Sequence, residues 1–360
     1  MESKEIKGAA IKRNYQRWDG SQRFYFGGRL MTGPRPYAPM LVLLLINCVS
    51  GLLIAFPCVF YGSKNQYAPL IVIVLQLIAI NVFWVLWSLT DPGIIPPVAH
   101  PNIDILKTTF FLHNSSFVKV KYWYTCNIIR PPRSVHCAQW DCWIERMDHH
   151  CPWLGWCVGK RNYAYFILFI TILTTYSISG TIIMFTYLFD FMEHQKEDSN
   201  ISDTKAFSQA MKKSPLILPL WLLGILCTVF LGLLVFYHGM LMFQGKTTHE
   251  DLKESGYRIR PFDKLSCLKN FFQQFFVRNP PVKFKPREFY KEPSIKYPEK
   301  KSRSEHLSWI RRSVISSFDF IGFLRFTWII NQWVLHSDSS KSGSKWLNWI
   351  PSKKWNQPRR

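Results

Sequence analysis

Cysteine and histidine side chains gather in one stretch of this sequence. Four of the nine cysteines lie within residues 136–157, interleaved with histidines. The group comprises Cys137, Cys142, Cys151, Cys157, His136, His149 and His150. In a small secreted chain such cysteines suggest disulfides, but cysteine mixed with histidine indicates metal binding or catalysis. Zinc favours tetrahedral sites of Cys thiolate and His nitrogen, and a loop with little core of its own gains stability from such a cross-link.

One of these cysteines has a neighbourhood that differs from that of a metal ligand. Cys151 ends the tetrapeptide Asp148-His149-His150-Cys151. A thiol is a useful nucleophile only as the thiolate, and an adjacent histidine can accept its proton. A carboxylate beside that histidine would orient the ring and stabilise its cationic form. The spacing by itself leaves two interpretations open, a catalytic cysteine or a further set of metal ligands.

Four apolar segments flank this stretch and must position it at a membrane. They cover residues 38–61, 68–90, 163–189 and 215–243, and none contains Lys, Arg, Asp or Glu. A hydrocarbon core of about 30 Å takes roughly 20 helical residues to cross, and each segment is long enough. Four such runs favour a membrane protein over a soluble one. Because the residues before the first segment are polar and basic, we expect no cleavable signal peptide.

The distribution of basic residues predicts how the spans are oriented. Lys and Arg number 8 before the first span, 8 in the 91–162 loop and 24 after residue 243. Since cytosolic flanks carry the excess of Lys and Arg, both termini and the middle loop are expected in the cytosol. The sequon Asn200-Ile201-Ser202 then faces the lumen, where glycosylation takes place. Anionic lipid at the cytosolic leaflet accounts for the net charge of +22, so we expect membrane lipids and no nucleic acid as partners.

The order of residues through the loop and around the spans follows a longer pattern. Matching positions in and beside the loop are Cys126, Arg130, Pro131, Arg133, His136, Cys137, Asp148, His149, His150, Cys151, Cys157, Asn162 and Phe166. Elsewhere, Asp91-Pro92-Gly93 follows the second span, Thr247-Thr248-His249-Glu250 follows the fourth, and Asn270-Phe271 lies beyond. In this pattern the chain resembles the DHHC protein S-acyltransferases, or palmitoyltransferases. The 14–33 segment is similar to the N-terminal region of the plant and fungal Ras-palmitoylating branch.

The resemblance implies a fold and its division into regions. We expect an all-α membrane protein in which four transmembrane helices carry a cytosolic zinc-binding cysteine-rich domain between helices 2 and 3. The expected regions are a cytosolic N-terminal segment (1–37), transmembrane helices 1 and 2 (38–90), the cysteine-rich domain (91–162), transmembrane helices 3 and 4 (163–243), a cytosolic region with the Thr-Thr-x-Glu and aromatic-Asn motifs (244–281), and a basic, Trp-rich cytosolic tail (282–360).

The resemblance also implies a reaction. A long-chain acyl group, typically palmitoyl, would pass from acyl-CoA to Cys151 and then to a cysteine of a protein at the cytosolic face. His149 is expected to be the general base, Asp148 its orienting partner, and Thr248 a hydrogen-bond donor to Asp148. Four basic residues would meet the phosphates of the acyl-CoA co-substrate, or equally the lipid headgroups: Arg130, Arg133, Lys160 and Arg161. Tyr176, in the middle of the third span, is expected to close the acyl cavity and limit chain length.

Zinc binding is where the sequence departs from the family pattern. Up to two structural zinc ions are implied, and their retained ligands would be Cys126 and His136 for one ion, and Cys137, His150 and Cys157 for the other. Tryptophan stands at the three missing ligand positions, which are Trp123, Trp140 and Trp143. An indole ring offers only an N–H donor and cannot ligate zinc. Cys142 lies one residue from position 143 and would replace that ligand only after a local shift of the chain.

Three interpretations of these tryptophans stay open. In the first, the zinc sites are degenerate and packing of the tryptophan side chains supports the fold. In the second, the chain is a catalytically impaired DHHC-like membrane scaffold. In the third, the source organism reads UGA as cysteine, so that the translated residues are cysteines. The coding nucleotides decide the third interpretation, since UGG at all three positions excludes it.

The remaining expectations concern location and partners. We expect a multi-pass integral membrane protein of the ER, Golgi, another endomembrane or the plasma membrane. Its partners would be cytosolic-face protein substrates with acceptor cysteines, and an accessory subunit is a possible further partner. In the tail, residues 314–335 are expected to lie in the membrane plane as an amphipathic helix rather than to form a fifth span.

Overall fold

The computed structural model of the chain describes residues 12–96, 110–113, 116–119, 121–123, 128–199, 201–253, 266–276 and 281–290. The chain divides into two units, residues 1–298 and 299–360, and every described residue belongs to the first. The predicted in-plane helix at 314–335 therefore lies outside the described residues, as do Asn200 of the sequon and Cys126.

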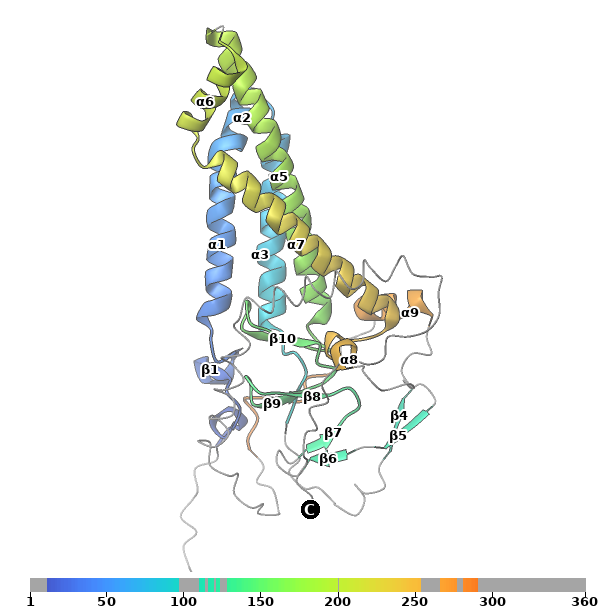
Figure 1. Cartoon of the computed structure of the whole chain (residues 1–360). Helices are drawn as coiled ribbons and strands as arrows, with labels where there is room; N and C mark the ends of the chain where they lie inside the picture. The colour runs from blue at the N-terminus through green and yellow to red at the C-terminus, as the bar shows by residue number, and fades with distance from the viewer. Residues whose placement is uncertain are drawn as a thin grey trace, which may run out of the picture. The chain divides into compact units, whose positions relative to one another are not determined.

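Long apolar helices form the larger part of the described structure. The first consists of α1 (Tyr37–Leu53), a π turn (Ile54–Cys58) and α2 (Val59–Ser63), and the others are α3 (Ala68–Leu89), α5 (Tyr163–Ser199) and α7 (Ile217–Gln244). Four helical stretches are long and apolar enough to cross a membrane. Figure 1 shows α1, α3 and α5 running lengthwise together and α7 crossing them obliquely, and α5 packs against both α3 and α7. Many of their large apolar side chains face outward, as lipid-facing side chains do.

Proline and glycine mark the irregular points of these helices. Pro57 has no N–H to donate, and the first helix widens there into a π turn before α2 resumes. At the end of α7, Gly245 takes the left-handed conformation with φ 67°, which ends the helix and turns the chain toward the next element.

The described part of the connection between the third and fourth predicted spans is mostly helical. The helix α5 continues to Ser199, and α6 (Asp203–Lys213) begins a few residues later. Residues 190–214 contain no glycine or proline, the strongest helix breakers. Lys196 bonds Asp203 at 2.6 Å across the short connection.

Where the structure describes it, the region between α3 and α5 contains short strands joined by turns, so the prediction of an all-α protein is not confirmed. The strands β3 (Ile94–Ile95), β9 (Cys142–Ile144) and β8 (Val135–Cys137) form one antiparallel sheet, and β10 (His149–Cys151) pairs with β11 (Trp156–Val158). The other strands form two-stranded ribbons: β1 (Arg23–Tyr25) with β2 (Leu30–Thr32), β4 (Phe110–His113) with β5 (Ser116–Lys119), and β6 (Lys121–Trp123) with β7 (Ile128–Arg130). Tight turns between closely spaced cysteine and histidine residues favour such hairpins over helices.

Tryptophan side chains form the core between these strands and the membrane helices. Trp140 is fully buried, and its ring meets that of Trp156 edge to face at 4.9 Å. Trp156 in turn contacts Trp87 of α3 at 6.4 Å. Because buried aromatic rings contribute large apolar contact areas, this chain of rings anchors the strands to the end of the second span.

The N-terminal segment and residues 281–290 complete this side of the molecule. The ring of Trp18 packs on Phe284 at 4.1 Å, and the backbone N–H of Tyr15 donates to the carbonyl of Pro286 at 3.0 Å. The backbone N–H of Ser21 donates to the carbonyl of Trp140 at 2.9 Å. Two further helices, α8 (Thr248–Lys253) and α9 (Cys267–Phe276), follow α7.

Candidate active site

The β10–β11 hairpin separates the two neighbouring histidines of the tetrapeptide. In its register, His149 lies opposite Val158, His150 opposite Cys157 and Cys151 opposite Trp156. Since successive side chains of a strand point to opposite faces, His149 and Cys151 share one face and His150 lies on the other. The strand therefore assigns one histidine to the cysteine and the other to a different cluster.

His149 connects a buried carboxylate to Cys151. Its Nδ1 lies 2.8 Å from Oδ2 of Asp148, and its side chain shares a face of β10 with Cys151. Burial by itself would lower the pKa of His149, but the interactions with Asp148 and with Cys151 outweigh it and raise that pKa to about 10. Burial would likewise raise the pKa of Asp148, yet His149 and the backbone of Thr248 lower it to about 2. The pair is thus arranged to hold a cationic imidazole beside the sulfur.

The start of α8 supplies the remaining partners of Asp148. The backbone N–H of Thr248 donates to Oδ1 of Asp148 at 2.9 Å, and its hydroxyl donates to Oδ2 at 2.7 Å. Asp148 is only 1% exposed, so these bonds satisfy a carboxylate that water does not reach. The predicted contact between Thr248 and Asp148 is present in the structure.

The Thr-Thr-x-Glu motif folds as a capping box. The backbone N–H of Thr247 donates to Oε2 of Glu250 at 2.9 Å, and the backbone N–H of Glu250 donates to the hydroxyl of Thr247 at 3.2 Å. Glu250 also accepts two bonds from the guanidinium of Arg133, at 2.6 and 2.5 Å. The motif therefore begins a short helix, presents Thr248 to the carboxylate of Asp148 and ties that helix to the cysteine-rich loop.

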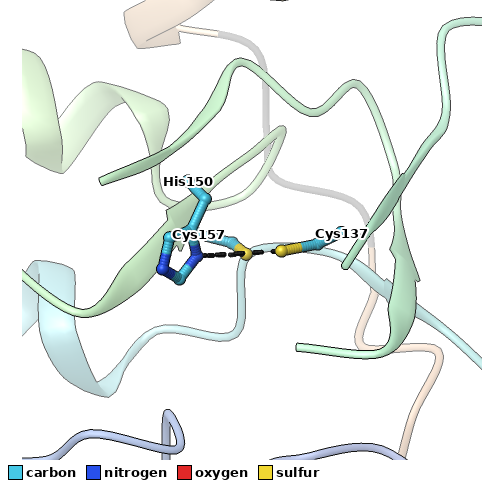
Figure 2. A group of neighbouring side chains, drawn as sticks. All are labelled: Cys137, His150 and Cys157. Atoms are coloured by element: carbon cyan, nitrogen blue, oxygen red, sulfur yellow. Dashed lines mark hydrogen bonds between the residues drawn. The ribbon is translucent and has the colours of Figure 1, made fainter. Parts of the chain in front are cut away.

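The second cluster gathers on the other face of β10. Figure 2 shows Cys137 of β8 and Cys157 of β11 meeting beside the imidazole of His150. Their sulfurs lie 3.7 and 3.4 Å from Nδ1 of His150. A tetrahedral zinc, with bonds of about 2.3 Å to sulfur and 2.0–2.1 Å to nitrogen, separates such atoms by about 3.6 Å. These three side chains thus fit a zinc ion.

The same cluster favours the thiolate form of Cys137. Burial would raise the pKa of the Cys137 thiol, but hydrogen bonds from Cys157 and His150 hold that pKa well below its ordinary value. The backbone of Trp140 lowers that pKa as well.

The side chain of Trp140 packs in the aromatic core and does not take the place of a metal ligand. Its side chain is fully buried, and within the part of the chain that the structure describes its indole N–H has no hydrogen-bond partner. The side chain occupies the aromatic core with Trp156 instead.

The first predicted zinc site is only partly visible. Cys126 and the side chain of Trp123 lie outside the described residues. His136 and Trp143 are described; they face each other across β8 and β9, with ring centroids 5.5 Å apart. His136 also places Nε2 3.4 Å from Oδ1 of Asp141.

Cys142 does not stand in for Trp143. It lies opposite Cys137 in the β8–β9 register, on the other face of β9 from Trp143. Its sulfur accepts a hydrogen bond from Nε2 of Gln22 at 2.9 Å. A slip of one residue would reverse every side chain of the strand, so the local shift considered from the sequence is wrong.

The basic residues expected at the co-substrate phosphates make contacts within the protein. Arg133 bonds Glu250, Lys160 bonds Glu145 at 2.7 Å, and Arg161 lies 3.7 Å from Asp91. The guanidinium of Arg130 lies over the ring of Trp143, 5.3 Å from its centre. These contacts brace the loop, and the role of the four residues toward acyl-CoA stays a prediction.

Tyr176 takes part in a polar contact between the first and third spans. Its hydroxyl lies 2.5 Å from the hydroxyl of Ser50, and both side chains are buried. The position agrees with a mid-span residue that closes a cavity, while the limit on chain length stays a prediction.

The motifs of the sequence did not predict two residues that reach Asp148 and His149 from the membrane helices. His238 of α7 is 2% exposed and approaches both Asp148 and His149. Tyr163, the first residue of α5, places its hydroxyl 3.2 Å from Nδ1 of His238. The signal was available, because an ionisable residue inside an apolar span is a functional candidate by default.

Comparison with known proteins identifies the family of this site. The DHHC palmitoyltransferase family profile matches residues 116–255. Over 309 residues the chain is 31% identical to Protein S-acyltransferase 8 of Arabidopsis thaliana, an alignment that covers 78% of this chain and 73% of that protein. The chain belongs to the DHHC family. The resemblance inferred from the motifs is confirmed.

Other members of the DHHC family agree on the activity. Palmitoyltransferase ZDHHC18 of Homo sapiens is 34% identical over 266 residues, which cover 69% of this chain and 66% of the relative. Palmitoyltransferase ZDHHC14 of Mus musculus is 33% identical over 274 residues, which cover 69% of this chain and 53% of the relative. This DHHC protein is accordingly a protein S-acyltransferase that transfers palmitoyl groups.

Proposed function

We propose that Cys151 is the nucleophile of this acyltransferase and that His149, Asp148 and Thr248 prepare it. The observation that carries the proposal is the position of His149, which is bonded to a buried carboxylate and lies on the same face of β10 as Cys151. The Cys151 thiolate attacks the thioester carbonyl of acyl-CoA, the C–S bond to CoA breaks, and the leaving thiolate takes the proton held by His149. His149 then accepts the proton of the protein cysteine that attacks the acyl-enzyme, and Cys151 leaves as thiolate.

The proposal includes a structural zinc ion on Cys137, His150 and Cys157. The distances among their ligand atoms agree with tetrahedral coordination. Such an ion would join the β8–β9 hairpin to the β10–β11 hairpin and so hold the strand that carries Cys151. A second ion near His136 is part of the same proposal, with Cys126 as its other retained ligand.

The acyl chain of the co-substrate would lie among the four spans. Each buried methylene contributes about 0.8 kcal/mol, so a long chain favours such a cavity over water. The Tyr176–Ser50 contact supports Tyr176 as the residue that closes the far end. For the CoA phosphates, Lys160 is the best supported of the four basic residues because it lines a hollow beside Asp148 together with Arg146 and Lys246.

The proposal places the catalytic loop, both termini and the protein substrates on the cytosolic side of the membrane. The excess of Lys and Arg beside the spans supports this orientation. Membrane lipids are partners by the same argument, since basic flanks favour an anionic leaflet. The substrates are proteins whose acceptor cysteines lie close to that surface.

The test is covalent labelling of the purified full-length protein with radiolabelled palmitoyl-CoA. We expect hydroxylamine-sensitive label on the wild type and none on Cys151→Ser. Cys267→Ser, which changes an exposed cysteine of α9, is the matched control and should keep the label. Label that persists on Cys151→Ser contradicts the proposed nucleophile. Absence of label from the wild type instead favours the alternative of a catalytically impaired scaffold with degenerate zinc sites.

A further inference from the structure

A histidine of the fourth span lies against the catalytic pair. His238 is six residues before the end of α7, in a helix that otherwise contains no ionisable side chain apart from Tyr237 and Cys227. One ring nitrogen of His238, one of His149 and a carboxylate oxygen of Asp148 all lie within 4.8 Å of one another. A buried imidazole in an apolar span is costly, so its position beside the reacting groups calls for an explanation.

The surroundings of His238 enclose the ring of His149. Phe166 of α5 contacts both imidazoles edge to face, at 5.4 Å from His149 and 5.3 Å from His238. The rings of His149 and His238 themselves lie 6.0 Å apart. His149 is also held by Asp148, whose carboxylate lies near His238 as well. The ring that must face Cys151 is therefore bordered by membrane-helix residues in addition to its carboxylate partner.

Tyr163 fixes His238 in this place. The hydroxyl of Tyr163 lies 3.2 Å from Nδ1 of His238, and both side chains are buried. When the hydroxyl donates to Nδ1, the proton of a neutral His238 resides on Nε2, so one tautomer and one ring orientation are selected. Tyr163 begins α5, so the contact joins the third span to the fourth directly behind the active site.

We propose that the Tyr163–His238 pair positions His149. The membrane helices α5 and α7 thereby help to hold the imidazole that faces Cys151. His238 is a positioning residue, since it acts through His149 and Asp148 and not on the acyl group. The loop that carries Cys151 is small, and its tetrapeptide is held from one side by Thr248. The Tyr163–His238 pair gives the same group a second support, which keeps the imidazole aligned with the sulfur during both proton transfers.

The experiment measures the single-turnover rate of acyl-enzyme formation by rapid quench, with full-length protein in detergent and increasing palmitoyl-CoA. In His238→Leu we expect the maximal rate to fall about 10- to 100-fold, while the half-saturating concentration stays within about 2-fold. Tyr163→Phe removes the hydroxyl alone and should lower the maximal rate in the same manner. The matched control is His194→Leu, which changes a histidine at the far end of α5 and should leave the rate unchanged.

His238→Asn is the rescue variant. Its side-chain oxygen lies close to where Nδ1 was and can accept the Tyr163 hydroxyl, so this variant should recover most of the rate lost in His238→Leu. A wild-type maximal rate in His238→Leu overturns the proposal. The proposal is also overturned if His238→Asn and His238→Leu are equally slow, equally destabilised and weaker in acyl-CoA binding. That result would mean that His238 only fills space between the helices.

The inference rests on the proposed role of His149, and the same experiment separates the two. His149→Gln and Cys151→Ser are measured in parallel. If His149→Gln keeps the wild-type rate, the assignment of His149 as base fails whatever His238 does. If His149→Gln is inactive and His238→Leu is not impaired, only the inference about the Tyr163–His238 pair fails.

Discussion

At the scale of single residues, the alternation of side chains along β10 gives the two histidines of the tetrapeptide different partners. His149 faces Cys151 and Asp148, whereas His150 faces Cys137 and Cys157. Two identical side chains at neighbouring positions thus have different partners because β10 is extended. A helical tetrapeptide would have placed successive side chains about 100° apart and could not have separated them onto opposite faces.

Glu250 gives a prediction at this scale. Burial would raise the pKa of this carboxyl, but the Arg133 guanidinium outweighs it and holds the pKa below its ordinary value of about 4.5. A group whose folded pKa is depressed stabilises the fold above its unfolded pKa and loses that contribution as pH falls through the folded value. Glu250→Gln should therefore lower the free energy of unfolding by about 2 kcal/mol at neutral pH, as expected for a charged hydrogen bond that is lost.

The measurement is thermal unfolding of both proteins between pH 3 and pH 8. The difference between wild type and Glu250→Gln should be constant at neutral pH and shrink progressively as pH falls below about 4.5. A difference that stays the same throughout this range would show that the variant acts through the shape of α8 rather than through the charge.

At the scale of the elements, aromatic packing occupies a position where the family pattern predicts a zinc ligand. Trp140 is fully buried against Trp156, in the turn that follows Cys137. The structure agrees with the interpretation that tryptophan packing supports the loop. The identity of the coded residue is decided by the coding nucleotides, as argued from the sequence.

Trp140→Cys tests how much of the stability of the loop comes from tryptophan packing and how much from zinc binding. Without zinc, loss of the buried ring should destabilise the protein by about 3–5 kcal/mol. With zinc, the new thiol supplies a fourth ligand, so metal affinity should exceed that of the wild type. Zinc titration followed by thermal unfolding measures both effects, and Trp140→Ser, which adds no thiol, is the matched control. An affinity unchanged by the cysteine would contradict a metal site beside residue 140.

A prediction about acyl-chain length follows from the position of Tyr176 in the helical bundle. If the Tyr176–Ser50 contact closes the acyl cavity, Tyr176→Ala should open space for longer chains. Each additional methylene contributes about 0.8 kcal/mol when it is buried, so acyl chains two carbons longer should gain about 10-fold in preference relative to palmitoyl. Competition between acyl-CoAs of different length measures this ratio, and Tyr187→Ala serves as a control at another buried tyrosine of α5. An unchanged preference ratio would show that Tyr176 does not close the acyl cavity.

At the scale of the whole molecule, separate parts of the sequence meet at one end of the helices. The catalytic hairpin lies between α3 and α5 in sequence, while α8 follows α7, and the backbone N–H of His249 donates to the carbonyl of Asp148 at 3.1 Å. Figure 1 shows β10 and α8 beside each other at this end of the bundle. Each connection between the spanning helices lies on one side of the membrane. The predicted orientation can therefore be tested by asking which side each connection faces.

The orientation predicts that the connection between α5 and α7 is lumenal. The sequon at Asn200 should therefore be glycosylated in microsomes, and Asn200→Gln should abolish the resulting shift in mobility. A second sequon, placed at the C-terminus, should stay unmodified because that end is predicted to be cytosolic. The reverse pattern, with the C-terminal sequon modified and Asn200 bare, would invert the topology.

The sequence alone determined the spans, the acyltransferase family and the tetrapeptide, because hydrophobic run length and motif spacing are properties of neighbouring residues. It also predicted the contact of Thr248 with Asp148. Tertiary structure decided which of the basic residues are held in ion pairs, that Cys142 faces away from the position of Trp143, and that His238 and Tyr163 reach the catalytic pair. These facts join residues that are far apart in the chain, and only the packing of α5 and α7 with the strand register brings them together.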